Sequence, residues 1–295
     1  MSENTNNEFL TTKEVADLLR IKERKLYDLV SAQEIPCVKA TGKLLFPKAE
    51  LMHWIRTGEK LQAGGAKEER AKVIAGSHDP LLEWAIRESA CGLAMQFDGS
   101  QGGLDLFESN KVAATGLHIP NSQADEWNLH AVQNRFAKNN CVLVRWASRQ
   151  QGLVVARDNP LKISKLADLK KRKVATRQPG AGGMMLFELL LAQHEMQLAD
   201  LAVTETCRTE NETIAAVASG IADAAPGLQA LAAQYGLGFV PTRVEQFDLL
   251  VCRKAWFEKP FQSLLAFTGT EVFKNKASQF AGYDITGLGK VVWNG

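Results

Sequence analysis

The stretch LTTKEVADLLRIKERKLYDLVSAQEIPCVKATGKLLFPKAELMHWI, residues 10–55, decides the architecture of the first part of the chain. Thr11 or Thr12 can cap a helix, and Glu14 lies three residues after Thr11, which is the spacing of a capping box. A helix is therefore expected to begin here. Three apolar side chains recur at helical spacing and are expected to form its inner face: Val15, Leu18 and Leu19.

A second helix, a hairpin and a third helix follow at short intervals. After a turn at 20–22, the second helix is expected from about Glu23 to Ala32, and Ile35-Pro36 ends it. A two-stranded hairpin is centred on Thr41-Gly42, and Pro47 suits the first turn of the third helix. Helix, turn, helix, hairpin and helix in this order predict a winged helix-turn-helix.

The same segment resembles the excisionase-type DNA-binding family nearly from end to end. The resemblance implies that side chains of the second helix lie in or beside the major groove, namely Lys22, Arg24, Lys25 and Tyr27, and that wing residues contact the DNA backbone, namely Lys39, Thr41 and Lys43. A cluster of cations at the start of a recognition helix suits contacts to base edges. The alternative is a solvated face in which Glu23 and Asp28 are the neighbours. The family wing usually carries an Arg–aromatic pair where this chain has Leu44-Leu45, which weakens the case for the wing as a phosphate contact.

Composition limits the classes of protein that the chain can belong to. The 295 residues carry 35 Lys and Arg against 33 Asp and Glu, a formal charge of +2, so any DNA contact must be local rather than chain-wide. No apolar run approaches the roughly 20 residues of a membrane helix, and the polar start MSENTNNEF lacks the pattern of an export signal. The five cysteines are dispersed without a C-x-x-C pair, which favours reduced thiols and a cytoplasmic location.

The chain is expected to divide into a winged helix-turn-helix domain (1–57), a linker (58–72) and a large α/β domain (73–295). The linker prediction rests on the polar composition of TGEKLQAGGAKEERAK, residues 57–72. From Val73 onward, short apolar runs alternate with amphipathic stretches, which predicts βα units and a mostly parallel sheet.

Five strand-to-helix corners in the large domain combine glycine or polar residues with a helix start. They are 77–80, 98–103, 178–183, 209–212 and 223–227. Each corner is expected to expose backbone N–H groups at the positive end of a helix, which favours an anion. Because such corners converge at the carboxyl ends of strands, they predict a ligand cleft.

Residues 73–295 resemble the periplasmic-binding-protein-like sensor domains of bacterial regulators, in particular those related to molybdate- and tungstate-binding proteins. The likeness is carried by GSHDPLLEWA (76–85), DGSQGGL (98–104), ATGLHI (114–119), QGLVVARDNP (151–160), TRQPGAGGMMLFELLL (176–191), ENETIAAVASGIADAAPG (210–227) and FVPTRVEQFDLLV (239–251). The resemblance implies a type II fold with two lobes, one of about 73–155 plus 245–295 and the other of about 156–244. QGLVVAR (151–157) and QFDLLVCR (246–253) would be the crossing strands.

The resemblance and the corners together give a set of expected ligand-binding residues. The set comprises Ser77, His78, Asp98, Ser100, Gln101, His118, Gln178, Gly180, Ala181, Gly182, Gly183, Asn211 and Pro226. Many relatives have Gly-Ser-Gly-Thr-Arg where this chain has Gly180-Ala181-Gly182-Gly183-Met184, so three donors to an oxyanion are lost. Backbone N–H groups can still hold a tetrahedral anion. A different oxyanion or a small organic anion is the alternative ligand.

The resulting expectation is a ligand-responsive transcription regulator that binds operator DNA and senses a small anion, with no membrane segment. A homodimer or higher homo-oligomer is expected, because one small module offers few base contacts. The alternative is a cytoplasmic small-anion-binding or cofactor-assembly protein that does not bind DNA. No enzyme activity, cofactor or metal is expected, since the sequence lacks a P-loop, a G-x-S-x-G elbow and an H-E-x-x-H motif.

Overall fold

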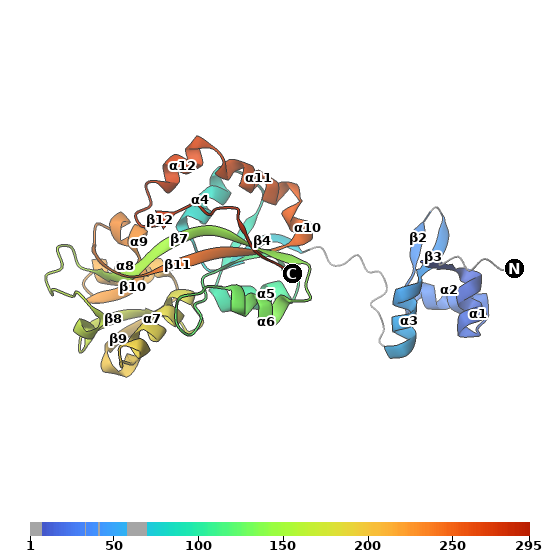
Figure 1. The fold of residues 1–295 in the computed structure, drawn as a ribbon, viewed down its shortest axis with the longest axis horizontal. Coiled ribbons are helices and arrows are strands. Elements are labelled where there is room, and N and C mark those ends of the chain that lie inside the picture. Colours follow the sequence, from blue (N-terminus) through green and yellow to red (C-terminus); the bar gives the residue numbers. More distant parts are fainter. Residues whose placement is uncertain (1–7, 33, 41, 58–69) are drawn as a thin grey trace. The chain divides into compact units, whose positions relative to one another are not determined.

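The computed structural model describes residues 8–32, 34–40, 42–57 and 70–295. Its contacts divide the chain into two compact units, Met1–Glu69 and Arg70–Gly295 (Figure 1). The architecture is that of the predicted fold class: a helix-turn-helix unit with a hairpin wing, and a two-lobed α/β unit.

The small unit packs three helices on a three-stranded antiparallel sheet of order β1-β3-β2. Its elements are β1 (Phe9–Thr11), α1 (Thr12–Leu19), α2 (Glu23–Ser31), β2 (Val38–Ala40), β3 (Lys43–Pro47) and α3 (Lys48–Thr57). The hairpin prediction is confirmed, because Val38 pairs with Leu45 and Ala40 with Lys43. Two details differ: β1 was not predicted, and Pro47 ends β3 instead of standing in α3, since it pairs with Phe9.

Helix α1 begins with the predicted capping box. The backbone N–H of Thr11 donates to Glu14 Oε2 at 2.7 Å, and the backbone N–H of Glu14 donates to Thr11 Oγ1 at 3.4 Å. The small core consists of Val15, Ala16, Leu26, Ile35, Phe46 and Leu51. The prediction for Leu18 was wrong: this side chain is 47% exposed, because Val15, Ala16 and Leu19 provide the inner face.

The large unit is built on one ten-stranded sheet, whose main path has the order β5-β4-β6-β11-β7-β10-β8-β9. Its strands are β4 (Ala71–Gly76), β5 (Ala94–Phe97), β6 (Val112–Leu117), β7 (Cys141–Val155), β8 (Lys173–Arg177), β9 (Ala202–Cys207), β10 (Ala224–Leu228), β11 (Gly238–Cys252), β12 (Tyr283–Asp284) and β13 (Val291–Asn294). Its α-helices are α4 (Pro80–Glu88), α5 (Ser100–Glu108), α6 (Leu129–Phe136), α7 (Gly182–Gln193), α8 (Glu210–Ala218), α9 (Gln229–Gln234), α10 (Arg253–Trp256), α11 (Lys259–Thr268) and α12 (Glu271–Ala277).

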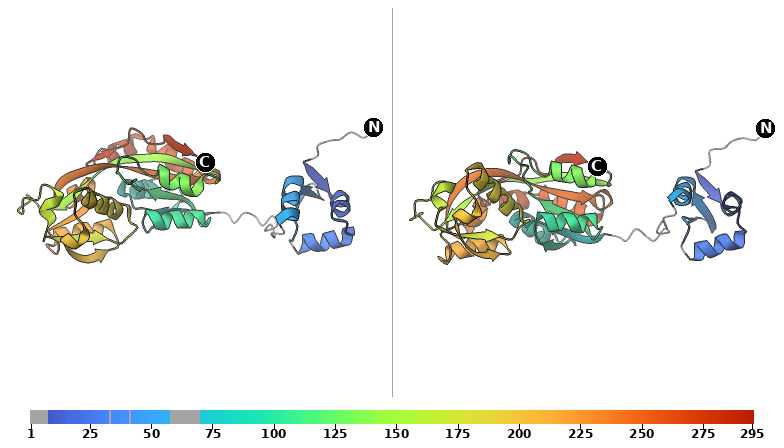
Figure 2. Two further views of the ribbon diagram at one scale, coloured as in Figure 1. Left: turned by 60° about the horizontal axis from the view of Figure 1, so that its bottom comes forward. Right: turned by 90° about the horizontal axis from the view of Figure 1, so that it is seen from below.

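Two long antiparallel strands, β7 and β11, run side by side through the whole unit (Figures 1 and 2). At one end β11 pairs with β6 of the β4–β5–β6 lobe, here called lobe 1, and at the other β7 pairs with β10 of the β8–β9–β10 lobe, lobe 2. The strands within each lobe pair in parallel. The predicted mostly parallel sheet is therefore correct only inside the lobes, because the crossing strands extend well beyond the predicted segments and pair antiparallel.

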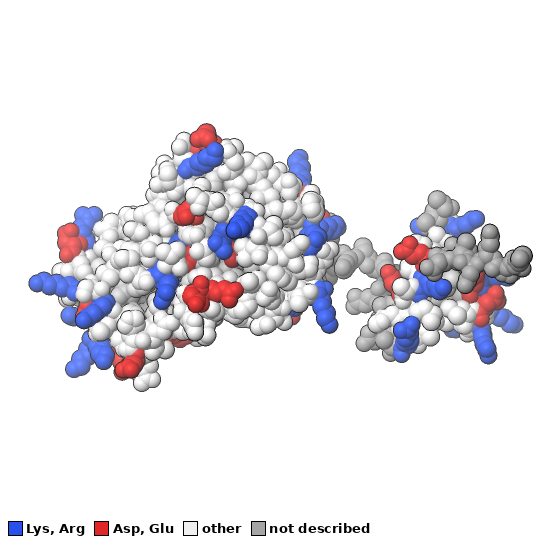
Figure 3. Space-filling model, in the orientation of Figure 1, with Lys and Arg blue, Asp and Glu red and all other residues white. Residues whose placement is uncertain are grey.

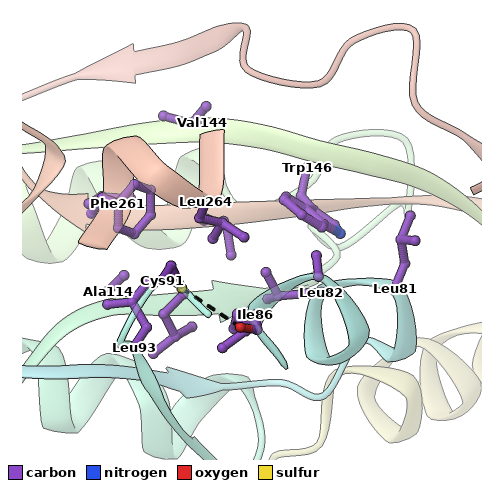
Figure 4. Packing of buried hydrophobic residues seen from close by; sticks show 14 of the residues in the cluster. Leu81, Leu82, Ile86, Cys91, Leu93, Ala114, Val144, Trp146, Phe261 and Leu264 are labelled. Atoms are coloured by element: carbon purple, nitrogen blue, oxygen red, sulfur yellow. Dashed lines mark hydrogen bonds between the residues drawn. The ribbon is translucent and has the colours of Figure 1, made fainter. Parts of the chain in front are cut away.

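Each lobe buries both faces of its part of the sheet. In lobe 1, Ile74 faces a cluster under α4, α11 and α12, while the next residue, Ala75, faces a cluster under α5 and α6, as strand alternation requires. Figure 4 shows the first cluster, in which Leu82 and Ile86 of α4 lie opposite Trp146 of β7 and Leu264 of α11. The helices of lobe 2 likewise cover both faces, α7 one of them and α8 and α9 the other.

Two further sequence predictions need correction in the large unit. The linker prediction, 58–72, extended too far, because Ala71 and Lys72 belong to β4 and Arg70 is anchored to lobe 1. The Arg70 guanidinium donates to the carbonyl oxygens of Phe107 at 2.7 Å and of Val112 at 2.8 Å, and it lies 4.2 Å from the centroid of the Phe107 ring. The fifth predicted corner, 223–227, is largely strand: β10 fills Ala224–Leu228 as a central strand between β7 and β8.

Candidate functional site

Three of the predicted corners meet where the two lobes face each other. In lobe 1, Ser77 follows β4 and Ser100 begins α5, and their hydroxyl oxygens lie 2.6 Å apart in a fully buried position. From lobe 2, the turn before α7 reaches this place: a Cβ atom on Gly99 would lie 3.5 Å from the carbonyl oxygen of Gly180. One on Gly180 would lie 3.6 Å from Cβ of Gln101. The structure therefore brings Ser77, Ser100, Gln101 and the 180–183 turn together.

The two helices that begin at this junction lack side-chain caps. Gly99 precedes α5 and Ala181 precedes α7, and neither offers a side-chain acceptor to the first backbone N–H groups. By contrast, Asp79 caps α4 and Thr209 caps α8. Open N–H groups at the positive ends of two helices, one from each lobe, favour a small anion bound between them.

His118 follows β6 and stands between the lobes. Its backbone N–H donates to Ser100 Oγ at 3.3 Å, and its ring Nδ1 lies 2.8 Å from Glu245 Oε2 on β11. A Cβ atom on Gly182 would lie 2.5 Å from His118 Nε2 and 2.7 Å from the His118 carbonyl oxygen. Only glycine leaves enough room at this position of α7 for the ring to lie against the helix start.

A buried ionic network lies directly behind His118. The guanidinium of Arg149, on β7, donates to Asp79 Oδ2 at 2.9 Å and to Glu245, and both carboxylates are fully buried with it. Asp79 also accepts from the Tyr283 hydroxyl at 2.7 Å and from Trp146 Nε1 at 3.0 Å. Both carboxylates are paired with Arg149 and hydrogen-bonded, which offsets the cost of burying their charges.

The network fixes the charges of its members. Burial alone would raise the pKa of Glu245, but Arg149 and His118 outweigh burial and lower that pKa to about 2. Burial works against the charged form of Arg149 as well, and the neighbouring carboxylate of Glu245 more than compensates, so its pKa lies above the ordinary value. Burial, reinforced by Asp79, raises the pKa of Tyr283 well above its ordinary value, which keeps the phenol protonated as a donor.

Other residues predicted for the site lie at its edge or are engaged elsewhere. The ring of His78 bonds Glu83 at 2.6 Å and stacks edge-on against Phe97. Asp98 and Asn211 are exposed. The carbonyl oxygen of the Gln178 side chain accepts from Arg177 at 3.3 Å. Pro226 is buried in β10, where it lines a cavity of about 10 Å³ together with Gln151 and Gly183.

Sequence reasoning missed the charged residues of the network, Arg149 and Glu245. Both stand inside long strands that carry other polar residues too, and both are fully buried, as a charged group is only when it is paired. Asp79 was seen only as part of a corner. Its pairing with Arg149, 70 residues later in the chain, could not be inferred from local spacing.

The candidate DNA-contacting residues of the small unit lie on exposed positions. Lys22, Arg24 and Lys25 cluster at the start of α2, whose N-cap residue, Lys22, makes no side-chain cap. Tyr27 is 49% exposed, and Lys39 and Lys43 are exposed on the wing, while Thr41 lies outside the described residues. On the face drawn in Figure 3, acidic and basic side chains of the large unit are interspersed.

Comparison with known families identifies both units. A PBP superfamily domain matches residues 83–269, which is most of the large unit. The chain belongs to the PBP superfamily. A helix-turn-helix domain matches residues 9–59, ahead of the PBP domain. These two kinds of domain indicate DNA binding by the small unit and ligand binding by the PBP domain.

The chain is similar over almost its whole length to a bacterial protein. It is 26% identical over 303 residues to the uncharacterized protein YvgK of Bacillus subtilis (strain 168), and the alignment covers 96% of this chain and 97% of that protein. The alignment therefore extends over both units of this chain.

Solved structures share the fold of the PBP domain. A putative phosphate ABC transporter substrate-binding protein with bound phosphate from Clostridium perfringens aligns with a TM-score of 0.53 at 12% identity, over 72% of this chain and 99% of that one. A mutant of Corynebacterium glutamicum OxyR with bound hydrogen peroxide aligns with a TM-score of 0.50 at 11% identity, over 92% and 90% of the two chains. At these identities the likeness concerns the fold alone.

Within the residues that the structure describes, no three His, Cys, Asp or Glu side chains are grouped so that they could hold a metal ion. No helix in the same part of the chain is long and apolar enough to cross a membrane. None of the five cysteines, all of which are described, forms a disulfide.

Proposed function

We propose that the protein is a ligand-responsive transcription regulator that binds operator DNA through its helix-turn-helix unit and senses a small anion through its PBP domain. The observation that carries the proposal is the meeting of two uncapped helix N-termini, α5 of lobe 1 and α7 of lobe 2, beside the hydroxyls of Ser77 and Ser100. Such a regulator acts in the cytoplasm, where the DNA is.

The mechanism follows from the position of the site between the lobes. An anion that contacts α5 and α7 at once has more partners when the lobes are closed, so its binding favours the closed state by the difference in affinity. We propose that closure changes the spacing of two helix-turn-helix units in a homodimer and thereby changes the affinity for paired half-sites.

The candidate ligands are small oxyanions and small organic anions. The resemblance to molybdate- and tungstate-binding relatives makes those two oxyanions the first to test. The chain has Gly180–Met184 where relatives carry hydroxyl and guanidinium donors, so the proposed site relies on backbone N–H groups of α5 and α7, together with Ser77 and Ser100.

The anion-binding part of the proposal is tested by thermal shift of the full chain with oxyanions and small carboxylates. A ligand that binds only the folded state raises the melting temperature. Ser100→Ala should weaken the binding of an active anion by about 1–3 kcal/mol, because a buried donor is lost. Ser109→Ala, at the opposite end of α5, is the matched control, since its hydroxyl bonds the Asp105 carbonyl oxygen at 2.9 Å. Unchanged affinity in Ser100→Ala would remove Ser100 from the site.

The DNA-binding part of the proposal is tested by an electrophoretic mobility-shift assay with DNA from the region upstream of the gene that encodes this chain. Selective, salt-sensitive binding is expected, because phosphate contacts release counterions. Absence of selective binding, in protein that still responds to an anion in the thermal-shift panel, would refute the regulator proposal and leave a binding protein.

A further inference from the structure

Two of the five cysteines lie directly opposite each other on the crossing strands. Cys141, the first residue of β7, pairs in register with Cys252, the last residue of β11. The backbone N–H of Arg253 donates to the carbonyl oxygen of Asn140 at 3.0 Å. In an antiparallel ladder, a bond at this place flanks a pair that exchanges no backbone hydrogen bonds and whose Cα atoms lie about 4.5 Å apart. The two side chains of such a pair point to the same face of the sheet and lie close together.

This geometry suits a disulfide. A disulfide joins residues whose Cα atoms are about 4.4–6.8 Å apart and whose Cβ atoms are about 3.5–4.5 Å apart. Directly opposite residues of a pair without backbone hydrogen bonds come within this range with little movement of the backbone. Both cysteines are free thiols in this structure, so a bond between them would be a new covalent state of the protein.

The two thiols differ in their access to solvent. Cys141 is only 1% exposed and lies in the cluster under α5 and α6, whereas Cys252 is half-buried at the edge of that cluster. Burial raises the pKa of Cys141 to about 11, so this thiol stays protonated at neutral pH. A buried, protonated thiol reacts poorly with a dissolved oxidant. Cys252 is therefore the sulfur that an oxidant reaches first, and Cys141 is the thiol held beside it.

The pair lies where the chain enters the PBP domain. Arg70 is the first residue of that unit, and its guanidinium interacts electrostatically with both thiols. The same guanidinium donates to the carbonyl oxygens of Phe107 and Val112, which anchors the start of the unit to lobe 1. A chemical change at the two sulfur atoms therefore alters the surroundings of the residue that fixes this entry point.

We propose that Cys141 and Cys252 form a redox-sensitive pair, which a hydroperoxide such as hydrogen peroxide converts into a disulfide. This inference does not depend on the proposed anion site. In the first step the Cys252 sulfur attacks the peroxide: an S–O bond forms, the O–O bond breaks, and the thiol proton leaves in a molecule of water. The product is a sulfenic acid on Cys252.

In the second step the Cys141 sulfur attacks the sulfur of this sulfenic acid. The S–S bond forms, the S–O bond breaks, and the proton of Cys141 leaves in a second molecule of water. The two thiols together lose two electrons, which the peroxide gains. Because the two sulfur atoms are neighbours in the ladder, the step is intramolecular, which compensates for the low reactivity of a buried thiol. A small thiol such as glutathione reverses the change by thiol–disulfide exchange.

Peptide mapping of the full chain tests the proposal. The chain is reduced, freed of the reductant and treated with an equimolar amount of hydrogen peroxide. Remaining thiols are then blocked by alkylation, and the peptides are analysed by mass spectrometry without reduction. We expect a peptide that links Cys141 to Cys252 and a fall in the number of free thiols from five to three, since one disulfide consumes two thiols. Dithiothreitol should restore all five.

Three variants separate the two steps. Cys141→Ala removes the second thiol, so peroxide should leave Cys252 as a sulfenic acid that dimedone traps. Cys252→Ala removes the accessible thiol, so Cys141 should stay unoxidised. Cys37→Ala is the control: Cys37 is also half-buried but lies in the small unit, so the link between Cys141 and Cys252 should form as before.

Three results on the unaltered chain would overturn the proposal. They are oxidation of Cys252 without a link to Cys141, a disulfide between two copies of the chain, and retention of all five thiols. Since the mapping uses the unaltered chain, it decides the question even if a variant fails to fold. Any of these results leaves the proposed anion site and the proposed DNA contact unaffected.

Discussion

At the scale of single residues, Arg149 is a charged side chain held entirely within the protein. Its guanidinium is fully buried, it is ion-paired to both Asp79 and Glu245, and it lies 4.3 Å from the centroid of the Phe247 ring. Removing one member of such a network leaves the others charged and without a partner, and this costs more than the intact network contributes.

Arg149→Met should therefore lower the free energy of unfolding by about 3–5 kcal/mol, because two buried carboxylates lose their counter-charge. Denaturant unfolding of the full chain measures this. Arg87→Met is the control: Arg87 pairs with Glu83 but is 69% exposed, so a change below about 1 kcal/mol is expected. Equal effects of the two substitutions would show that the buried ionic network contributes no more to the free energy of unfolding than a surface ion pair does.

Glu245 gives the network a dependence on pH. Its pKa falls from the ordinary 4.5 to about 2 on folding, so the folded state binds the proton less readily than the unfolded state. The stabilisation from its ionised form is therefore fully present above about pH 5 and is lost as the pH falls toward about 2.

The unaltered chain should be more stable than Glu245→Gln at about pH 6, and the difference should shrink as the pH is lowered through that interval. Urea unfolding of both proteins at a series of pH values measures it, and contributions from other carboxyls cancel in the difference. A difference that stays constant across the interval would contradict the lowered pKa of Glu245.

At the scale of elements, the start of α7 controls how closely the lobes approach. Gly182 and Gly183 are adjacent in the same first turn, yet their surroundings differ. A Cβ atom on Gly182 would meet the His118 ring at 2.5 Å, whereas one on Gly183 would meet only Gln151 Nε2 at 4.0 Å.

Gly182→Ala should hold the lobes apart. The affinity for an active anion should therefore fall at least about tenfold, which corresponds to about 1.4 kcal/mol of binding free energy. Gly183→Ala should leave the affinity within about twofold, because its Cβ atom has space. Calorimetric titration with the strongest anion of the thermal-shift panel makes the comparison. Comparable losses in both variants would show that helix geometry, rather than closure against His118, explains the effect.

The sequence predicted most elements but not their long-range pairing. The capping box of Thr11 and Glu14 and the strand-to-helix corners at Ser77, Ser100 and Gly182 were predictable, because caps, glycines and apolar runs act over a few residues. The predicted turn at 223–227 was wrong because the pairing of β10 with β7 and β8 overrides the local turn preference of Pro226-Gly227.

The candidate site was predictable to the same extent. Ser77 and His118, which directly follow strands, and Ser100, which begins α5, could be placed at the candidate site from local sequence, and their role in ligand binding stays a prediction. Arg149 and Glu245 were not, because they are 96 residues apart and their pairing depends on the register of two antiparallel strands, on which local spacing contains no information.

At the scale of the whole molecule, the proposed function assigns DNA contact to the small unit and anion binding to the PBP domain, so each activity should respond to substitutions in its own unit. Arg24 is exposed near the start of α2, far along the chain from the interlobe site.

Arg24→Ala should weaken operator binding by about 1–3 kcal/mol if the guanidinium contacts a base, and should leave the thermal stabilisation by an active anion unchanged. Mobility shift and thermal shift on the same preparation test both parts. Arg87→Ala, with the same change of charge in the PBP domain, should retain operator binding. Loss of the anion response in Arg24→Ala would show that the two units are not independent.

The crossing strands have a consequence for how such proteins can be altered. Residues 156–237 form one uninterrupted run between β7 and β11, and the ends of that run emerge side by side, because Val155 is paired with Gly238. The run can thus be exchanged as a cassette for the corresponding one of a relative, with both splice points on neighbouring strands. Such a chimaera would keep the lobe 1 wall, including His118, and acquire a new opposite wall, so binding domains with altered ligand preference could be assembled from natural halves.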